Sequence, residues 1–257
     1  MVTERAEVVI GADGLRSFVA RSVQAPTYNA RPGRTCSYYT YFSGVPLTGV
    51  EIYSRPGRAI VAMRTHHDLA CICTAWPVRE FPQVRANLER EFMASFALAP
   101  ELAERVRGGR REERFVGTGD LPFFYRKPYG PGWALVGDAG YHKDPNLGQG
   151  ISDAFRDAEL LAGALDAGLS GRQPLAAALA EYERLRNEET AEIYDFGYQL
   201  AALEPPSPDL QQILGALPGN QPDTDSFLGL IAGTTRPSAF FAPANVGRIL
   251  GGVAVPA

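Results

Sequence analysis

Residues 133–155 read WALVGDAGYHKDPNLGQGISDAF, and this stretch is the most informative about the fold. Its first four residues are apolar and typical of a buried strand, which ends at a Gly-Asp pair. The loop that follows carries Pro145, Gly148 and Gly150, and a helical pattern begins at Ile151. Bare glycine backbone lets N–H groups approach a ligand closely, and a helix N-terminus carries about half a positive charge. The stretch therefore predicts a strand, a ligand-binding loop and a helix whose N-terminus suits a carbonyl or an anion.

A second junction of this kind lies near the start of the chain, where residues 8–23 read VVIGADGLRSFVARSV. The pattern predicts a short strand, a tight Gly-Ala-Asp-Gly turn and a helix. Asp13 in this turn and Asp138 in the other junction each follow the C-terminal end of a buried strand. Open α/β sheets bind ligands at that end of their strands, so both carboxylates are candidate ligand-binding groups.

Between the two junctions the pattern changes to aromatic and β-branched runs over residues 35–76, which predicts a mostly antiparallel sheet. Apolar residues four apart, from Val84 to Phe96, then predict a helix that stops before Pro100. A short amphipathic turn through Leu102 and Val106 follows. This segment therefore has the composition of a separate, β-rich domain.

Two long helices are expected after the second junction, at residues 151–165 and 175–193. Residues 204–257 contain eight prolines, which favour loops and short pieces. We predict an α/β fold in which a partial doubly wound domain is interrupted by an inserted antiparallel β-rich domain. The predicted division of the chain is 1–30, 31–120, 121–203 and 204–257.

The composition is that of an ordinary globular protein, with 45% hydrophobic and 21% charged residues and a net charge of −4. No basic patch suits nucleic acid, and no apolar segment approaches the roughly 18 residues that a membrane helix needs. The three cysteines, Cys36, Cys71 and Cys73, are too few for a disulfide framework, so we expect a cytoplasmic protein. Cys71 and Cys73 lack further ligands at suitable spacing, so we expect no metal site and interpret them as core thiols.

The two junctions together resemble motifs of the FAD-dependent monooxygenases related to para-hydroxybenzoate hydroxylase. Gly11 to Gly14 with Arg16 and Ser17 resemble the DG motif of that family, and Gly137-Asp138 with the loop from Asp144 to Gly150 resembles its GD motif. The resemblance spans about residues 7–203. It implies that residues 1–30 and 121–203 bind FAD and that residues 31–120 bind substrate.

The resemblance also implies roles for individual residues. Asp138, beside Gly137, would accept a hydrogen bond from a ribityl hydroxyl of FAD, whereas Asp13 and Arg16 would lie near the pyrophosphate and the path of the nicotinamide. Pro145 and the backbone of Gly148, Gln149 and Gly150 would lie against the isoalloxazine ring, and Leu147 is a further cofactor-binding candidate in this loop. The aromatic residues that would contact substrate from the inserted sheet are Tyr39, Tyr41 and Trp76.

The implied function is an FAD- and NAD(P)H-dependent monooxygenase or oxidoreductase that acts on a small organic substrate, aromatic or polyketide-like, through a flavin C4a-hydroperoxide. A flavin halogenase or a saturating reductase is a nearby alternative. No acid–base residue can be assigned from the sequence, because cofactors of this class carry the bond-breaking chemistry themselves.

The sequence departs from the family at one point, because it contains no G-x-G-x-x-G motif for the ADP half of FAD. Two explanations stay open: a start assigned too far downstream in the gene, or a non-catalytic remnant that acts as a partner-binding domain. In either case an incomplete parallel sheet would expose apolar edges, so self-association is expected.

Structural explanations compete with several of these roles. Asp138 could cap the turn that follows its strand, and Asp13 has a turn-forming role as its main alternative. His142 could contact flavin or substrate, or be a surface histidine, and His66 and His67 are expected to be solvated in a hairpin turn. The aromatic residues of the sheet could equally form its core.

Overall fold

A computed structural model describes residues 4–251 of the chain, which form two compact units. Unit 1 comprises residues 4–31, 122–197 and 207–251, and unit 2 comprises residues 32–121 and 198–206. The predicted α/β class, with antiparallel sheets, is confirmed. The functional division into four segments stays a prediction.

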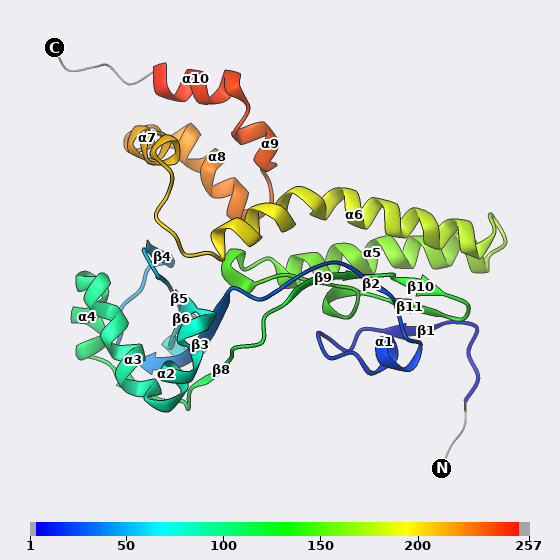
Figure 1. Cartoon of the computed structure of the whole chain (residues 1–257), viewed down its shortest axis with the longest axis horizontal. Helices are drawn as coiled ribbons and strands as arrows, with labels where there is room; N and C mark the ends of the chain where they lie inside the picture. The colour runs from blue at the N-terminus through cyan, green and yellow to red at the C-terminus, as the bar shows by residue number, and fades with distance from the viewer. Residues whose placement is uncertain (1–3, 252–257) are drawn as a thin grey trace. The chain divides into compact units, whose positions relative to one another are not determined.

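Unit 1 contains two small sheets (Figure 1). The first has the order β1-β11-β10, with bounds Val9–Gly11, Trp133–Leu135 and Tyr129–Gly130. The second has the order β12-β9-β2, with bounds Tyr141–His142, Phe123–Arg126 and Thr27–Arg31. Strands β1 and β11 are parallel, and Gly11 is opposite Leu135, so the loops that follow them leave the same edge of the sheet.

The helices of unit 1 begin with α1 (Phe18–Ser22), which follows the turn after β1. Both long helices were predicted, and α5 (Gly150–Leu169) and α6 (Leu175–Leu200) lie side by side (Figure 1). They pack on β11 through a cluster of buried residues, Ala134, Leu161, Leu179 and Tyr182. The 3₁₀ turns η4 (Gly137–Ala139) and η5 (Pro145–Leu147) lie between β11 and α5.

The C-terminal segment, residues 207–251, is helical where loops and short pieces were expected. Its helices are α7 (Pro208–Ala216), α8 (Gln221–Ala232), α9 (Pro237–Phe240) and α10 (Pro243–Gly251). A proline lies at or next to the start of each helix, where it has no hydrogen bond to lose and its fixed φ suits the helix. The prolines therefore begin helices here, and the expectation of loops was wrong.

Unit 2 is built on one antiparallel sheet with the order β4-β5-β6-β3-β7, and β8 also pairs with β3. The bounds of these strands are β3 Thr35–Ser43, β4 Val50–Arg55, β5 Arg58–Arg64, β6 Ala70–Pro77, β7 Arg110–Arg111 and β8 Val116–Thr118. The helices are α2 Phe81–Ala86, α3 Leu88–Ser95 and α4 Pro100–Arg107, with 3₁₀ turns at His66–Asp68, Val78–Glu80 and Phe96–Leu98. The helix predicted from Val84 to Phe96 is interrupted at Asn87, whose φ of −134° is not helical.

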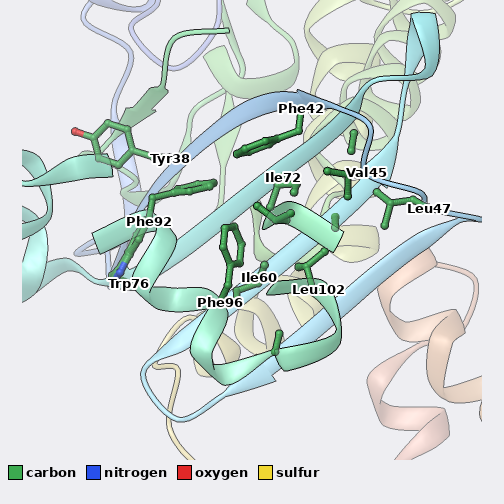
Figure 2. Close-up of a cluster of buried hydrophobic side chains, with 14 of the residues drawn as sticks. Tyr38, Phe42, Val45, Leu47, Ile60, Ile72, Trp76, Phe92, Phe96 and Leu102 are labelled. Carbon is green, nitrogen blue, oxygen red and sulfur yellow. The ribbon is translucent and has the colours of Figure 1, made fainter. Parts of the chain in front are cut away.

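One face of this sheet forms the core of unit 2, as Figure 2 shows. Alternate residues of β3 and β6 point into it, among them Phe42, Ile72 and Trp76. Phe92 of α3 and Phe96 of the 3₁₀ turn that follows α3 pack against them. From Cys36 to Ser43, buried and half-buried residues alternate along β3, as expected for a strand with one face in the core. The aromatic and β-branched composition of this run is what predicted the strand.

Within residues 4–251, no helix is both long and apolar enough to cross a bilayer. The same residues hold no group of three or more His, Cys, Asp or Glu side chains placed to bind a metal ion. All three cysteines are free thiols, and burial raises the pKa of Cys36 to about 11, so this thiol stays protonated at neutral pH.

Candidate functional site

The candidate site lies where β1 and β11 end in unit 1. The main-chain N–H of Val136 donates to the carbonyl of Gly11 at 3.0 Å, which fixes the two junctions beside each other. Asp138 follows in the η4 turn, where it is exposed to solvent. Within the described residues its carboxylate has no hydrogen-bond or ion-pair partner, so it is free to accept a hydrogen bond from a ligand.

The glycine loop, defined here as residues 144–150, begins with an Asx turn in which Asp144 accepts from the N–H of Asn146 at 3.1 Å. Gly148 has a φ of +67°, which residues with a Cβ rarely adopt, and it ends the η5 turn. A Cβ placed on Gly148 or Gly150 would meet no atom within 4 Å. The backbone of the loop is therefore open to a ligand, and glycine is not needed at position 150 for packing.

The side chains of the glycine loop do not all face the solvent. Pro145 is exposed, whereas Leu147 is buried and its Cδ1 would lie 3.3 Å from a Cβ placed on Gly197. Gln149 is only 6% exposed and points toward the C-terminal segment, to which its amide is hydrogen-bonded. Of the cofactor-binding candidates in the loop, Leu147 and Gln149 could therefore contribute only backbone atoms in this conformation.

Asp13 has a structural task. Its Oδ2 accepts hydrogen bonds from the main-chain N–H groups of Phe18 at 2.6 Å and Val19 at 3.1 Å, at the start of α1. Slight desolvation raises the pKa of Asp13, but hydrogen bonds from Ser17 and from these N–H groups outweigh it and lower the pKa below its usual value. The carboxylate is thus ionised and caps α1, as the turn-forming alternative predicted, while Arg16 beside it is exposed. A contact with the pyrophosphate of FAD stays a prediction for both residues.

An ionic cluster that the sequence did not predict adjoins the glycine loop in the chain, and three of its four side chains are buried. Lys143 forms an ion pair with Asp153 in the first turn of α5, and both side chains are less than 10% exposed. Arg156 bridges Asp153 and Asp157, with a distance of 2.9 Å to each carboxylate. The Lys143–Arg156 cluster, defined as these four side chains, carries two positive and two negative charges. The negative charge of Asp153 therefore does not cancel the positive potential at the N-terminus of α5.

Arg126 is a second group that sequence reasoning missed. Its guanidinium donates to the carbonyl of Ala139 at 2.8 Å and to that of Leu15 at 3.3 Å, so it joins the turn after β1 to the turn after β11. The guanidinium also lies over the ring of Phe124 at 4.1 Å. No local pattern could have identified this role, because the two carbonyls lie more than ten residues away on different loops. Lys143 and Asp153, by contrast, are separated by only ten residues, and both belong to the segment 133–155.

The histidines differ from expectation in part. His142 is buried: its Nδ1 hydrogen-bonds the carbonyl of Pro122, and its ring stacks on Phe124 with centroids 5.8 Å apart. The surface alternative for His142 was therefore wrong, because β12 pairs with β9 and covers the ring. His66 and His67 are exposed in the turn between β5 and β6, as predicted.

The three candidate substrate residues lie on opposite faces of the sheet of unit 2. Trp76 is fully buried in the core, whereas Tyr39 and Tyr41 are half-buried on the opposite face with Cys71 and Cys73. The two tyrosine rings meet edge to face with centroids 6.1 Å apart. Substrate contact has not been tested for any of the three residues. Only Tyr39 and Tyr41 have exposed atoms that could contact a substrate in this conformation, because Trp76 is fully buried in the core.

Comparison with known proteins gives a consistent assignment. No family model matches the chain. It is 28% identical over 214 residues to kynurenine 3-monooxygenase of Salinispora arenicola, which covers 75% of this chain and 45% of that protein. The crystal structure of PqsL, a probable FAD-dependent monooxygenase of Pseudomonas aeruginosa, matches with a TM-score of 0.64 and 26% identity over 77% of this chain and 56% of PqsL.

Further structures show the same fold. PqsL has also been crystallised in complex with 2-aminobenzoylacetate, and that structure matches with a TM-score of 0.63. A flavoprotein/dehydrogenase of Cytophaga hutchinsonii matches with a TM-score of 0.72 over 95% of this chain and 62% of its own, at 16% identity, which shows the fold alone. By sequence and by fold, this chain is similar to FAD-dependent monooxygenases, and it spans about half the length of the proteins it matches.

Proposed function

We propose that this chain provides the flavin-binding loops and the substrate-binding sheet of an FAD- and NAD(P)H-dependent monooxygenase. The observation that carries the proposal is the open backbone of Gly148 and Gly150 beside the unpartnered carboxylate of Asp138, at the C-terminal ends of two parallel strands. This arrangement fits the isoalloxazine and ribityl half of FAD. Since the sequence contains no G-x-G-x-x-G motif, it offers no such cradle for the ADP half.

When bound, FAD would supply hydride acceptance from the nicotinamide and the activation of dioxygen. The residues of this chain have more limited tasks. Asp138 would accept a hydrogen bond from a ribityl hydroxyl, and the backbone of the glycine loop would lie against the ring. The N-terminus of α5 places a positive potential beside that loop, which Lys143 and Arg156 preserve by neutralising Asp153.

The substrate in this proposal is a small organic molecule, aromatic or polyketide-like. Support comes from the relatives, one named for kynurenine and one crystallised with 2-aminobenzoylacetate, both of which carry an aromatic amine. Tyr39 and Tyr41 offer half-buried rings, and each ring has a hydroxyl that can hydrogen-bond a polar substituent. We place the protein in the cytoplasm, where its three free thiols stay reduced.

Flavin titration tests the proposal. Because this chain holds only the flavin and ribityl half, it is expected to bind FMN and FAD with dissociation constants within about threefold of each other. Asp138→Ala is expected to weaken both ligands about ten- to hundredfold, since a hydrogen bond to a charged group contributes roughly 1.5–3 kcal/mol. The thermal midpoint should not change, because Asp138 is exposed and without a protein partner among the described residues. Quenching of flavin fluorescence measures the dissociation constants of FMN and of FAD.

The competing function is a domain that binds no flavin and acts through a protein partner, which the missing dinucleotide motif favours. No quenching by either flavin at high protein concentration would support that alternative. Oxygen transfer itself is tested separately, by following label from isotopically labelled dioxygen into 2-aminobenzoylacetate with NADH or NADPH as reductant.

Self-association is part of the proposal, because unit 1 exposes large apolar side chains. Ile151 and Phe155, one turn apart on α5, are 74% and 73% exposed, and Val9 and Ile10 on β1 are about half exposed. We expect sedimentation velocity to show dimers or larger species whose share grows with concentration. The double variant Ile151→Ser with Phe155→Ser should shift the distribution toward monomer. A wild-type chain that sediments as monomer at every concentration would contradict this expectation.

A further inference from the structure

We propose that Gln149 is a positioning residue that couples the C-terminal segment, residues 207–251, to the glycine loop. The inference goes beyond the proposed function, because it assigns the C-terminal segment a role in fixing the conformation of residues 144–150. It rests on a side chain whose environment differs from that of both its neighbours.

Gln149 lies between two exposed glycines, yet its own side chain is 6% exposed. Its amide nitrogen, Nε2, donates to the carbonyl of Leu230 at 3.1 Å and to that of Ile231 at 2.8 Å. Both partners are carbonyls, so only the NH₂ end of the amide can face them, which fixes its orientation. The side chain is therefore anchored, and the exposed backbone on either side is attached to that anchor.

The two carbonyls belong to the last turn of α8, where a helix has carbonyl groups without partners inside the helix. The helix ends at Gly233, which has a left-handed backbone conformation. The carbonyl of Gly229, one turn earlier, already accepts hydrogen bonds from the N–H groups of Thr234 and Thr235 at 2.9 and 3.1 Å. The next two carbonyls in the chain are the ones that Gln149 takes. Gln149 is thus the C-terminal cap of α8, supplied from a residue about 80 positions earlier in the chain.

Through this cap, the glycine loop is connected to a well-packed part of the C-terminal segment. Leu230 is fully buried in a cluster with Ile213, Phe240 and Ile249, which come from α7, α9 and α10. A displacement of the α8 end would have to disturb this cluster. The C-terminal segment therefore gives Gln149 a rigid point of attachment.

A cavity of about 340 Å³ lies beside this connection. Its lining includes Gln149, Asp153 and Arg156 together with residues 232–237. The C-terminal segment is attached to α6 separately, through an ion pair of 2.9 Å between Arg236 and Glu189. The main-chain N–H of Ser238 also donates to Glu192 of α6 at 2.8 Å, and Phe241 packs against Phe196 of α6. Among these attachments of the segment, only the one through Gln149 involves the glycine loop.

Hydrogen–deuterium exchange of the flavin-free chain tests the coupling. Gln149→Met keeps the length of the side chain but has no hydrogen-bond donor. Local unfolding should therefore become more frequent both in the glycine loop and at the C-terminal end of α8. We expect exchange to rise about tenfold in residues 144–152 and also in residues 229–235. Arg236→Met, the matched control, should raise exchange around residues 234–241 and leave residues 144–152 unchanged.

A second variant separates hydrogen bonding from packing. Gln149→Lys retains a donor of similar reach, and a cation suits the negative end of α8, so exchange should return toward the wild-type rate in both segments. Equal acceleration in the Met and Lys variants would assign the effect to packing and overturn the proposal. Wild-type exchange of residues 144–152 in Gln149→Met would overturn it as well. Neither measurement requires flavin, so the coupling and the proposed function can fail independently.

Discussion

Gly150→Val is expected to weaken flavin binding by more than about a hundredfold, or roughly 3 kcal/mol, without destabilising the protein. A valine at this position meets no protein atom within 4 Å of its Cβ, and Gly150 does not have a positive φ. Valine is also a better helix residue than glycine at the start of α5. The variant should therefore fold with an unchanged or slightly higher thermal midpoint, while its side chain occupies the space that the proposed function assigns to the ring.

The control lies in the same helix. Gly163 is also open, because a Cβ placed on it would meet no atom within 4 Å, and it is nearly four turns from the glycine loop. Gly163→Val should bind flavin as the wild type does. Gly148 is a less informative position, because its φ of +67° would strain any valine there whether or not a ligand binds. Wild-type flavin affinity in Gly150→Val would show that no ligand approaches the loop, and the proposed site would have to be abandoned.

Lys143→Met is expected to lower the free energy of unfolding by about 3–5 kcal/mol, because it leaves a buried negative charge without compensation. The cluster of Lys143, Asp153, Arg156 and Asp157 is neutral as a whole, and removal of the ammonium leaves a net charge of −1 inside unit 1. Burial lowers the pKa of Lys143 below its usual value, and the attraction of Asp153 opposes this. Urea denaturation of the flavin-free protein measures the loss.

A double variant tests the electrostatic explanation. Lys143→Met combined with Asp153→Asn restores neutrality, so most of the lost stability should return. Lys127→Met is the matched control, because Lys127 also pairs with a carboxylate, that of Glu183, but is 37% exposed. Its loss should cost at most about 1 kcal/mol. Equal losses in the free energy of unfolding for Lys143→Met and Lys127→Met would show that burial of the cluster does not affect stability. A double variant that is no more stable than Lys143→Met would lead to the same conclusion.

Local patterns in the sequence predicted much of the fold. The two strand-to-loop junctions, both long helices and the antiparallel sheet follow from apolar periodicity and from the positions of glycine and aspartate, and the structure contains all of them. The parallel alignment of β1 and β11 brings the two junctions together as open α/β sheets require. These features were predictable because the periodicity of apolar residues and the conformational preferences of the backbone are set by residues close together in the sequence.

The candidate site was only half predictable in this way. The sequence identified Asp138, Gly148 and Gly150, whose exposure agrees with a ligand-binding role. It could not show that Asp13 caps α1, because the choice between a backbone N–H and a ligand depends on the local turn geometry. It also could not separate Trp76 from Tyr39, because alternation along a strand does not tell which face is covered by helices.

The remaining features depend on contacts between residues that are distant in the sequence. Arg126 joins two loops that are more than one hundred residues apart in the chain, and Gln149 caps a helix about 80 residues further on. The C-terminal prolines begin helices because those helices bury Leu230, Phe240 and Ile249 against one another, a gain that no single segment obtains alone. Local sequence thus established which backbone could meet a ligand, whereas long-range packing established which side chains hold that backbone in place.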